Sequence, residues 1–167
     1  MATEEGREVE LDDTDVELLR RIERDFDVSL DTLADELPLS RSAVHYRLSK
    51  LKETGVVEGV TADLDPLAFG LDMVAITDVS VTHEEGYSEE IGTELAAISG
   101  VEQVYYTMGD VDFVIIVRVR DRDRMNEVIN RIVAIESVKE TSSRFVMDEV
   151  KSSPKVLTNS FDGIGLG

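Results

Sequence analysis

The feature that most constrains the fold is a change in hydrophobic periodicity near residue 72. Before this point, apolar residues recur every three or four positions, which is the pattern of amphipathic helices. Beyond it, short β-rich stretches alternate with helical ones. Because a purely helical pattern precedes a mixed one, the 167-residue chain is predicted to form a helical domain followed by an α+β domain.

Three short helices are predicted in the first part of the chain. Asp12 or Asp13, Ser29 and Ser40 are the expected N-caps, because their side chains accept hydrogen bonds from free amides of a first helical turn. Each helix carries one apolar stripe: Leu18, Leu19, Ile22 and Phe26; Leu30, Leu33, Ala34 and Leu37; Val44, Leu48 and Leu51. With a short strand expected over 56–60, residues 1–60 are predicted to form a winged-type helix–turn–helix domain.

The second part of the chain predicts the element order βαββαβ. Its strands are expected over 73–82, 101–108, 112–120 and 138–150. Its two helices are expected to begin at a capping Ser88 and a capping Asp121. Ile98 and Val101 recur 37 residues later as Ile135 and Val138, a faint repeat that two βαβ-like halves would produce. This order is that of a ferredoxin-like domain, and we assign it to residues 72–151.

Two further segments complete the expected organisation. Residues 61–71, which contain Asp65-Pro66, are expected to be a hinge strand and linker. Residues 152–167 have no periodicity and are expected to be a mobile tail or an arm that docks on a neighbouring molecule.

The charge of the chain is strongly acidic. Aspartate and glutamate number 36 against 17 lysines and arginines, which gives a net charge of −19 and is the opposite of what DNA binding usually requires. The basic residues are 5 Lys and 12 Arg. In molar salt the Debye length is about 3 Å, so surface carboxylates hardly repel one another and keep a protein dissolved. The composition therefore indicates a salt-rich cytoplasm, such as that of a halophilic archaeon.

One basic segment interrupts this acidity. Residues 40–52 hold four basic side chains and no acid, whereas residues 1–37 hold 14 acids and 4 bases. The first turn of a recognition helix reaches base edges and flanking cations contact phosphates, so this segment is predicted to bind double-stranded DNA. The groove candidates are Ser40, Arg41, Ser42 and His45, and the backbone candidates are Arg47, Lys50 and Lys52. The alternative is a solvated helix face, and Tyr46 either stacks on a sugar or packs against the first helix.

The segment Met108, Gly109, Asp110, Val111 and Asp112 is a candidate effector site. It has the composition of a tight turn between two strands, which is also its plain structural explanation. Functionally, turn amides and carboxylates could bind the carboxylate and ammonium of a small zwitterion, with Thr141 and Ser143 completing the pocket. Two carboxylates without a fuller set of oxygen ligands are a poor metal signature.

Several function classes find no support in the sequence. The absence of cysteine excludes disulfides, thiolate metal sites and cysteine nucleophiles. No apolar run is long enough to span a membrane, and the acidic start of the chain is unlike a secretory signal, so we expect a cytoplasmic protein. His45 and His83 fall in different predicted domains and outside metal or triad spacing, so we expect neither an enzyme nor a metal or cofactor site.

The order of these motifs resembles the Lrp/AsnC, or feast/famine, family of prokaryotic transcription regulators. The resemblance covers residues 11–150 and rests on matching segments at 11–15, 33–37, 39–40, 55–59, 64–66 and 108–112. It implies an N-terminal DNA-binding domain and a ferredoxin-like domain that forms dimers and assembles further, to a tetramer or octamer. It also implies that an amino acid or related effector binds between dimers near the Gly-Asp turn.

The chain departs from the family pattern at Pro38, where glycine is usual. Proline does not supply a positive φ, so the turn between the second and third helices is expected to be built differently, with the second helix ending a residue early. The function expected overall is a DNA-binding transcription regulator that responds to an amino acid or related metabolite. The alternative is a metabolite-binding ferredoxin-like module that acts on a protein partner.

Overall fold

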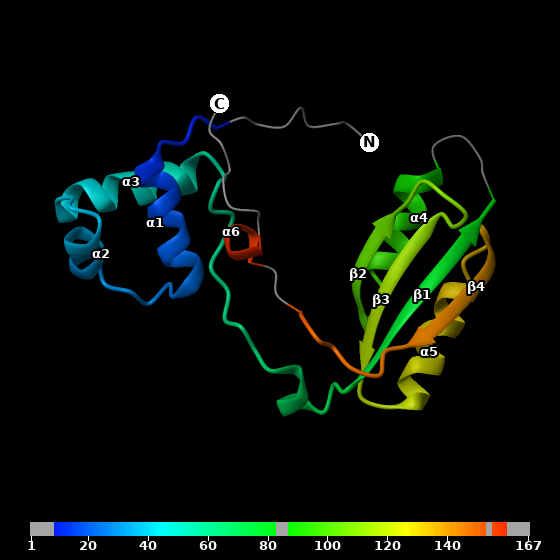
Figure 1. The fold of residues 1–167 in the computed structure, drawn as a ribbon. Helices are drawn as coiled ribbons and strands as arrows, with labels where there is room; N and C mark the ends of the chain where they lie inside the picture. The colour runs from blue at the N-terminus through cyan, green and yellow to red at the C-terminus, as the bar shows by residue number, and fades with distance from the viewer. Residues whose placement is uncertain (1–8, 83–86, 153–154, 160–167) are drawn as a thin grey trace. The chain divides into compact units, whose positions relative to one another are not determined.

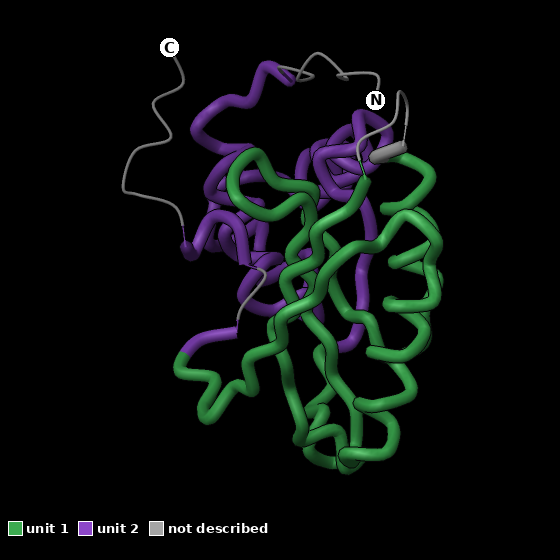
Figure 2. Tube along the Cα trace, turned by 90° about the vertical axis from the view of Figure 1, so that its right-hand side faces the viewer, with its two compact units in different colours: residues 1, 63–150 green, residues 2–62, 151–167 purple. Residues whose placement is uncertain are grey.

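The computed structural model describes residues 9–82, 87–152 and 155–159. The chain divides into two compact units, one of residues 63–150 and one of residues 2–62 with 151–167 (Figure 2). The α+β class is confirmed, because a helical unit precedes a unit with a four-stranded antiparallel sheet.

The N-terminal unit contains the three expected helices, α1 (Asp13–Arg24), α2 (Leu30–Glu36) and α3 (Arg41–Glu53) (Figure 1). Each begins after a predicted cap. The Asp12 carboxylate accepts from the Asp15 amide at 2.8 Å, and Ser29 and Ser40 accept from amides three residues onward. Local hydrogen bonding therefore sets all three helix starts.

The predicted apolar stripes form the core of this unit. Leu18, Leu33 and Val44, one from each helix, are almost fully buried, and Leu51 completes the face of α3. Phe26 is the exception, because α1 ends at Arg24 and leaves the ring 42% exposed. The apolar stripe predicted for the first helix therefore included one residue, Phe26, that lies beyond the end of α1.

Two expected strands are absent from the part of the chain that the structure describes. Residues 56–60 form no strand, because no neighbouring strand among the described residues pairs with them. The Val57 amide instead donates to the Leu51 carbonyl at 3.0 Å. The 61–71 segment contains a short 3₁₀ helix, η1 (Pro66–Phe69), rather than a hinge strand. Asp65 caps η1 and Gly70 ends it at φ 69°, so local turn chemistry outweighs strand propensity there.

The turn before α3 keeps the geometry that glycine would adopt. Pro38 has φ 25°, and the Leu39 amide donates to the Ala34 carbonyl at 3.0 Å, as in a Schellman motif. The positive φ expected only of glycine is therefore present at Pro38, but proline has no amide to donate the second hydrogen bond of that motif, so the turn differs in this bond alone. α2 does end at Glu36, one residue before Leu37, as expected.

Replacing Pro38 by Gly should stabilise the N-terminal unit by about 1 to 2 kcal/mol, because it relieves the φ strain and restores an amide that can bond the last turn of α2. Thermal unfolding followed by circular dichroism measures this gain. Pro38→Ala is the matched variant and should gain less, since a Cβ also disfavours positive φ. A melting temperature of P38G at or below that of the parent chain would contradict the strain.

The C-terminal unit has the predicted order βαββαβ. Its elements are β1 (Met73–Val81), α4 (Tyr87–Ala96), β2 (Val101–Tyr106), β3 (Phe113–Val119), α5 (Arg122–Val133) and β4 (Val138–Phe145). The strands are ordered β2-β3-β1-β4, and α4 and α5 cover the same face of the sheet (Figure 1). β4 is shorter than expected because its partner β1 begins at Met73 and offers no ladder beyond it.

The two helix starts in this unit differ in outcome. Asp121 caps α5 as expected and accepts from the Arg124 amide at 2.8 Å. Helix periodicity located α4, which spans Tyr87–Ala96. The expected cap at Ser88 is not tested, because its side chain lies outside the described part of the structure.

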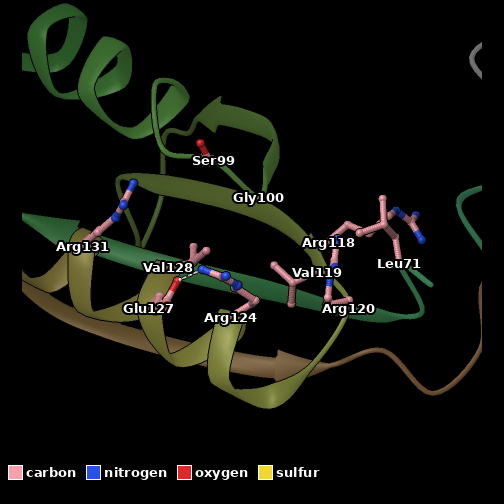
Figure 3. Close-up of a pocket in the computed structure, with 10 residues that line it drawn as sticks. All are labelled: Leu71, Ser99, Gly100, Arg118, Val119, Arg120, Arg124, Glu127, Val128 and Arg131. Carbon is pink, nitrogen blue, oxygen red and sulfur yellow. Dashed lines mark hydrogen bonds and ion pairs between the residues drawn. The ribbon is translucent and has the colours of Figure 1, made fainter. Parts of the chain in front are cut away.

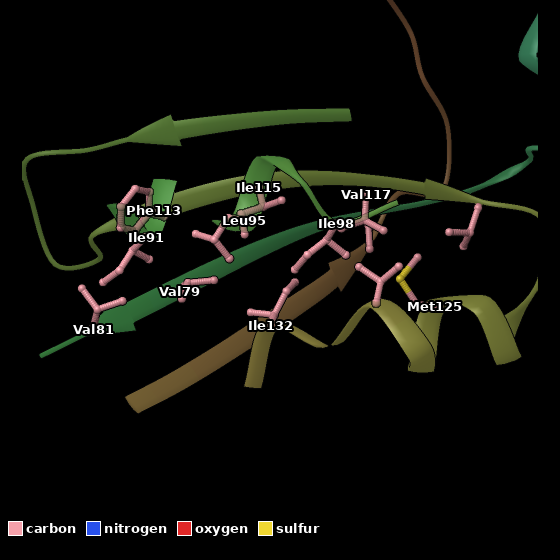
Figure 4. Close-up of a cluster of buried hydrophobic side chains, with 13 residues drawn as sticks. Val79, Val81, Ile91, Leu95, Ile98, Phe113, Ile115, Val117, Met125 and Ile132 are labelled. Carbon is pink, nitrogen blue, oxygen red and sulfur yellow. The ribbon is translucent and has the colours of Figure 1, made fainter. Parts of the chain in front are cut away.

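The helix-facing side of the sheet holds the main core (Figure 4). Residues of β3 alternate between buried and half-buried, so Phe113, Ile115 and Val117 face α4 and α5.

The 37-residue repeat predicted from the sequence is visible in the backbone hydrogen bonds of two turns. Val101 donates to Ile98 at 3.0 Å, and Val138 donates to Ile135 at 2.9 Å, so both helix-to-strand turns close in the same way.

The described C-terminal segment belongs to the N-terminal unit. α6 (Val156–Asn159) packs against α1, and the Glu23 carboxylate accepts from the Leu157 and Thr158 amides at 2.9 Å each. Desolvation raises the pKa of Glu23, but these hydrogen bonds outweigh it and lower the pKa below 4.5. The described part of the expected tail therefore docks on its own chain, and residues 160–167 lie outside the described residues.

Candidate functional site

The exposed surface of α3 carries most of the candidate DNA contacts. Arg41 lies in the first turn with its side chain 67% exposed, 3.4 Å from Asp31 of α2. Ser42 and His45 are exposed as well. Tyr46 is 68% exposed and so does not pack against α1. The Ser40 hydroxyl accepts from the Ala43 amide at 3.1 Å, so it already serves as the helix cap.

Arg47 is placed differently from the other cations of α3. Its guanidinium donates to Asp12 of the α1 cap at 2.7 Å and to Asp15 of α1 at 2.6 Å, and its side chain is 27% exposed. The hydrogen bond from Arg47 lowers the pKa of Asp12. Arg47 therefore fastens α3 to α1, a role that the sequence reasoning missed. The capping pair Asp12 and Asp15 was the signal that could have indicated it.

The remaining two cations lie at the end of α3. Lys50 and Lys52 are exposed, and the Lys52 ammonium is 5.6 Å from the centre of the Phe26 ring. That contact allows a weak cation–π interaction and leaves the ammonium open to solvent. From Arg41 to Lys52, α3 thus presents a surface without an acid, on which Arg41, Lys50 and Lys52 remain accessible, and Glu53 ends the helix.

The candidate effector segment forms the turn between β2 and β3. Met108 is 98% exposed, and Gly109 and Asp110 are exposed beside it. Asp112 is half-buried, and its carboxylate accepts from the Val81 amide at 2.8 Å, which ties the turn to the end of β1. The structure therefore separates the two carboxylates, because Asp110 faces solvent while Asp112 holds the turn in place.

Thr141 and Ser143 do not lie beside this turn within one chain. Both are on β4, and β1 separates β4 from β3. Two strand spacings amount to roughly 10 Å. The Ser143 hydroxyl is also 2.9 Å from that of the buried Thr77. A pocket that includes these residues and the turn would have to span the sheet.

Metal and membrane sites are not evident in the described ranges. Among residues 9–82, 87–152 and 155–159, no group of three or more His, Asp or Glu side chains could hold a metal ion. No helix within the same ranges is long and apolar enough to cross a membrane.

The architecture defines a class of protein: a helix–turn–helix domain with an exposed, largely basic third helix, joined in sequence to a ferredoxin-like α+β domain. Family models agree with both parts. Residues 11–58 match a winged helix-turn-helix DNA-binding domain, and residues 74–156 match the Lrp/AsnC ligand binding domain. The chain is a member of the Lrp/AsnC family, whose proteins are transcription regulators rather than enzymes.

Individual relatives span nearly the whole chain. The HTH-type transcriptional regulator FL11 of Pyrococcus horikoshii is 30% identical over 148 residues, which cover 89% of this chain and 97% of that protein. The leucine response regulatory protein LrpA of Mycobacterium tuberculosis is 30% identical, with a TM-score of 0.72 over 85% of this chain and 96% of LrpA. The same fold occurs in a Neisseria meningitidis regulator crystallised with L-Met, with a TM-score of 0.82, 23% identity and coverage of 89% and 97%.

Proposed function

We propose that this protein is a sequence-specific regulator of transcription that reads double-stranded DNA with α3. The observation that carries the proposal is the exposed surface of α3, which holds no acidic residue from Arg41 to Lys52 in a chain of net charge −19. The regulator would act in the cytoplasm as a dimer at least, with paired recognition helices on half-sites about one helical turn apart or a multiple of it. Arg41, Ser42 and His45 would meet base edges, with Ser40 and Tyr46 beside them, and Lys50 and Lys52 would lie nearer the phosphates, while Arg47 would keep α3 in place against α1.

Arg41→Ala should weaken binding to the specific site by about 1 to 3 kcal/mol, because a good base-edge contact is worth that much, and should barely change binding to random DNA. Lys52→Ala should weaken both about equally, since a phosphate contact carries no sequence information. Gel shifts on DNA upstream of the protein's own gene measure both. Equal losses on specific and random DNA for R41A would refute the assignment. An absence of any shift would favour a module that acts on a protein partner.

We further propose that the β2–β3 turn binds an amino acid or related metabolite. Support comes from the exposed Asp110, the solvent-facing Gly109 and the match to the Lrp/AsnC ligand binding domain. The L-Met complex of the Neisseria meningitidis regulator has the same fold. A ligand that prefers one assembly state would shift its population and thereby the spacing of the paired helices. Met108, Val111, Asp112, Thr141 and Ser143 would complete the site if a second copy closes it.

Asp110→Ala should abolish any amino-acid-dependent change in DNA affinity while leaving the melting temperature unchanged, because its carboxylate is exposed. Asp112→Ala should abolish the response and also destabilise the turn by about 1 to 3 kcal/mol, since it leaves the Val81 amide without this acceptor. Calorimetry with the twenty amino acids and gel shifts in their presence test both variants. If the unmutated chain binds none of them, the turn has only a structural role.

A further inference from the structure

A second pocket lies away from the effector turn. It is a space of about 440 Å³ at the C-terminal end of β3, between α5 and the Ser99-Gly100 turn (Figure 3). The seven residues of β3 separate this end from the β2–β3 turn, a distance of about 20 Å at 3.3 Å per residue. The two sites are therefore distinct within one chain.

The charge of this pocket opposes that of the chain. Four arginines and one glutamate line it, in a protein with 36 acids and 17 bases. Arg118 is neutralised by Glu149 at 2.7 Å, and Arg124 pairs with Glu127 at 2.6 Å. No carboxylate among the described residues pairs with Arg120 or Arg131. Two guanidinium groups at the pocket are thus left with positive charge and unused donors.

The frame around these arginines is closely packed. Gly100 has φ 98°, and a Cβ there would approach Val119 and Val128 to 3.0 Å each. The Gly100 carbonyl also accepts from the Arg118 amide at 2.8 Å. The turn, the end of β3 and α5 are therefore held in fixed register, and Val119 and Val128 provide an apolar floor. Guanidinium groups and an apolar floor together suit a ligand with an anionic end and a non-polar body.

We propose that this pocket binds a small organic phosphate, such as a mononucleotide or a sugar phosphate, as a second ligand of the protein. Arg124 lies between Arg120 and Arg131 (Figure 3), and it can leave Glu127, which is exposed, to donate to the phosphate oxygens together with Arg131, while Arg120 adds positive charge at the other end of the pocket. The non-polar part of the ligand rests on Val119 and Val128. A volume of about 440 Å³ is within the range of small-molecule sites and is concave, unlike the open surface along which a DNA backbone runs.

Isothermal titration calorimetry of the full chain in near-molar KCl tests the proposal with AMP, ribose 5-phosphate, inorganic phosphate and adenosine. The test variant is Arg124→Gln with Arg131→Gln, and the matched control is Arg122→Gln, an exposed arginine of the same helix outside the pocket. AMP or ribose 5-phosphate should bind the parent chain and R122Q equally, and adenosine should not bind. The double variant should bind roughly tenfold to hundredfold more weakly, the loss expected for one or two charge-assisted hydrogen bonds.

Five results would overturn the proposal. The first is that neither organic phosphate binds the parent chain at millimolar concentration, and the second is that R122Q and the double variant lose the same affinity for AMP. The third is that inorganic phosphate binds as tightly as the organic phosphates, and the fourth is that D110A loses its affinity for AMP. A further overturning result is that the double variant loses affinity for random duplex DNA while retaining its affinity for AMP. All three variants should melt at the temperature of the parent chain, because the replaced side chains are exposed.

Discussion

The free energy of unfolding of the N-terminal unit should fall by about 2 to 4 kcal/mol when Arg47 is replaced by Ala. The reason is the Asp15 carboxylate, whose side chain is only 10% exposed and whose partner is the Arg47 guanidinium at 2.6 Å. Without Arg47, a nearly buried charge loses its counter-ion and α3 loses its link to the α1 cap. Urea unfolding followed by circular dichroism measures the loss.

The matched control is Arg20→Ala, which removes an exposed pair with Glu17 at 3.7 Å and should cost less than about 1 kcal/mol. The parent chain should also lose stability as pH falls below 3.8, through the lowered pKa of Asp12, because protonation removes the carboxylate that Arg47 binds. R47A should lack that part of the pH dependence. If R47A unfolds like R20A, then Arg47 does not fasten the helices and remains available to phosphate.

DNA affinity should stay level or rise as KCl increases from low to molar concentration. Ordinary regulators lose affinity by factors of about 10³ to 10⁵ between 50 and 200 mM salt, because they release counterions. Here the 14 acids of residues 1–37 repel phosphate, and the Debye length of about 30 Å at 0.01 M lets that repulsion act at long range. Near molar salt the Debye length is about 3 Å, and only short contacts such as those of Arg41 remain.

Folding should follow the same dependence on salt, because self-repulsion among 36 acids opposes the compact state at low ionic strength. The melting temperature should therefore rise with KCl. Filter binding and thermal unfolding across one KCl series measure both effects, and NaCl at matched ionic strength is the control for ion type. A steep conventional decline in affinity, with a melting temperature indifferent to salt, would contradict our proposal of a halophilic origin.

The predictions that succeeded concern neighbours along the chain. Asp12, Ser29, Ser40 and Asp121 cap helices as expected, since a cap and the amides it accepts from lie within three residues. Apolar spacing located every helix and strand of the ferredoxin-like unit, because that spacing decides which face can be buried. The length of β4 was predicted wrongly, because its partner strand β1 decides where the ladder ends.

Only some features of the candidate sites could be predicted from the sequence. The basic segment and the Gly-Asp turn could be located from composition, because no acid interrupts the first and the second is a turn between two strands. The pocket lined by Arg120, Arg124 and Arg131 could not, because the Ser99-Gly100 turn that closes it comes from another part of the chain. A list of charges along the sequence does not reveal which of them are already paired.

The sequence alone determined the order of elements, the helix caps and the acid-free segment 40–52, since each depends on residues within a few positions of one another. The tertiary structure decided which side chains remain free to act. Arg47 donates to Asp12 and Asp15 from 35 and 32 residues away, and Asp112 accepts from the Val81 amide. Such long-range partners compete for the same donors and acceptors, and only the folded backbone determines which of them are close enough to bond.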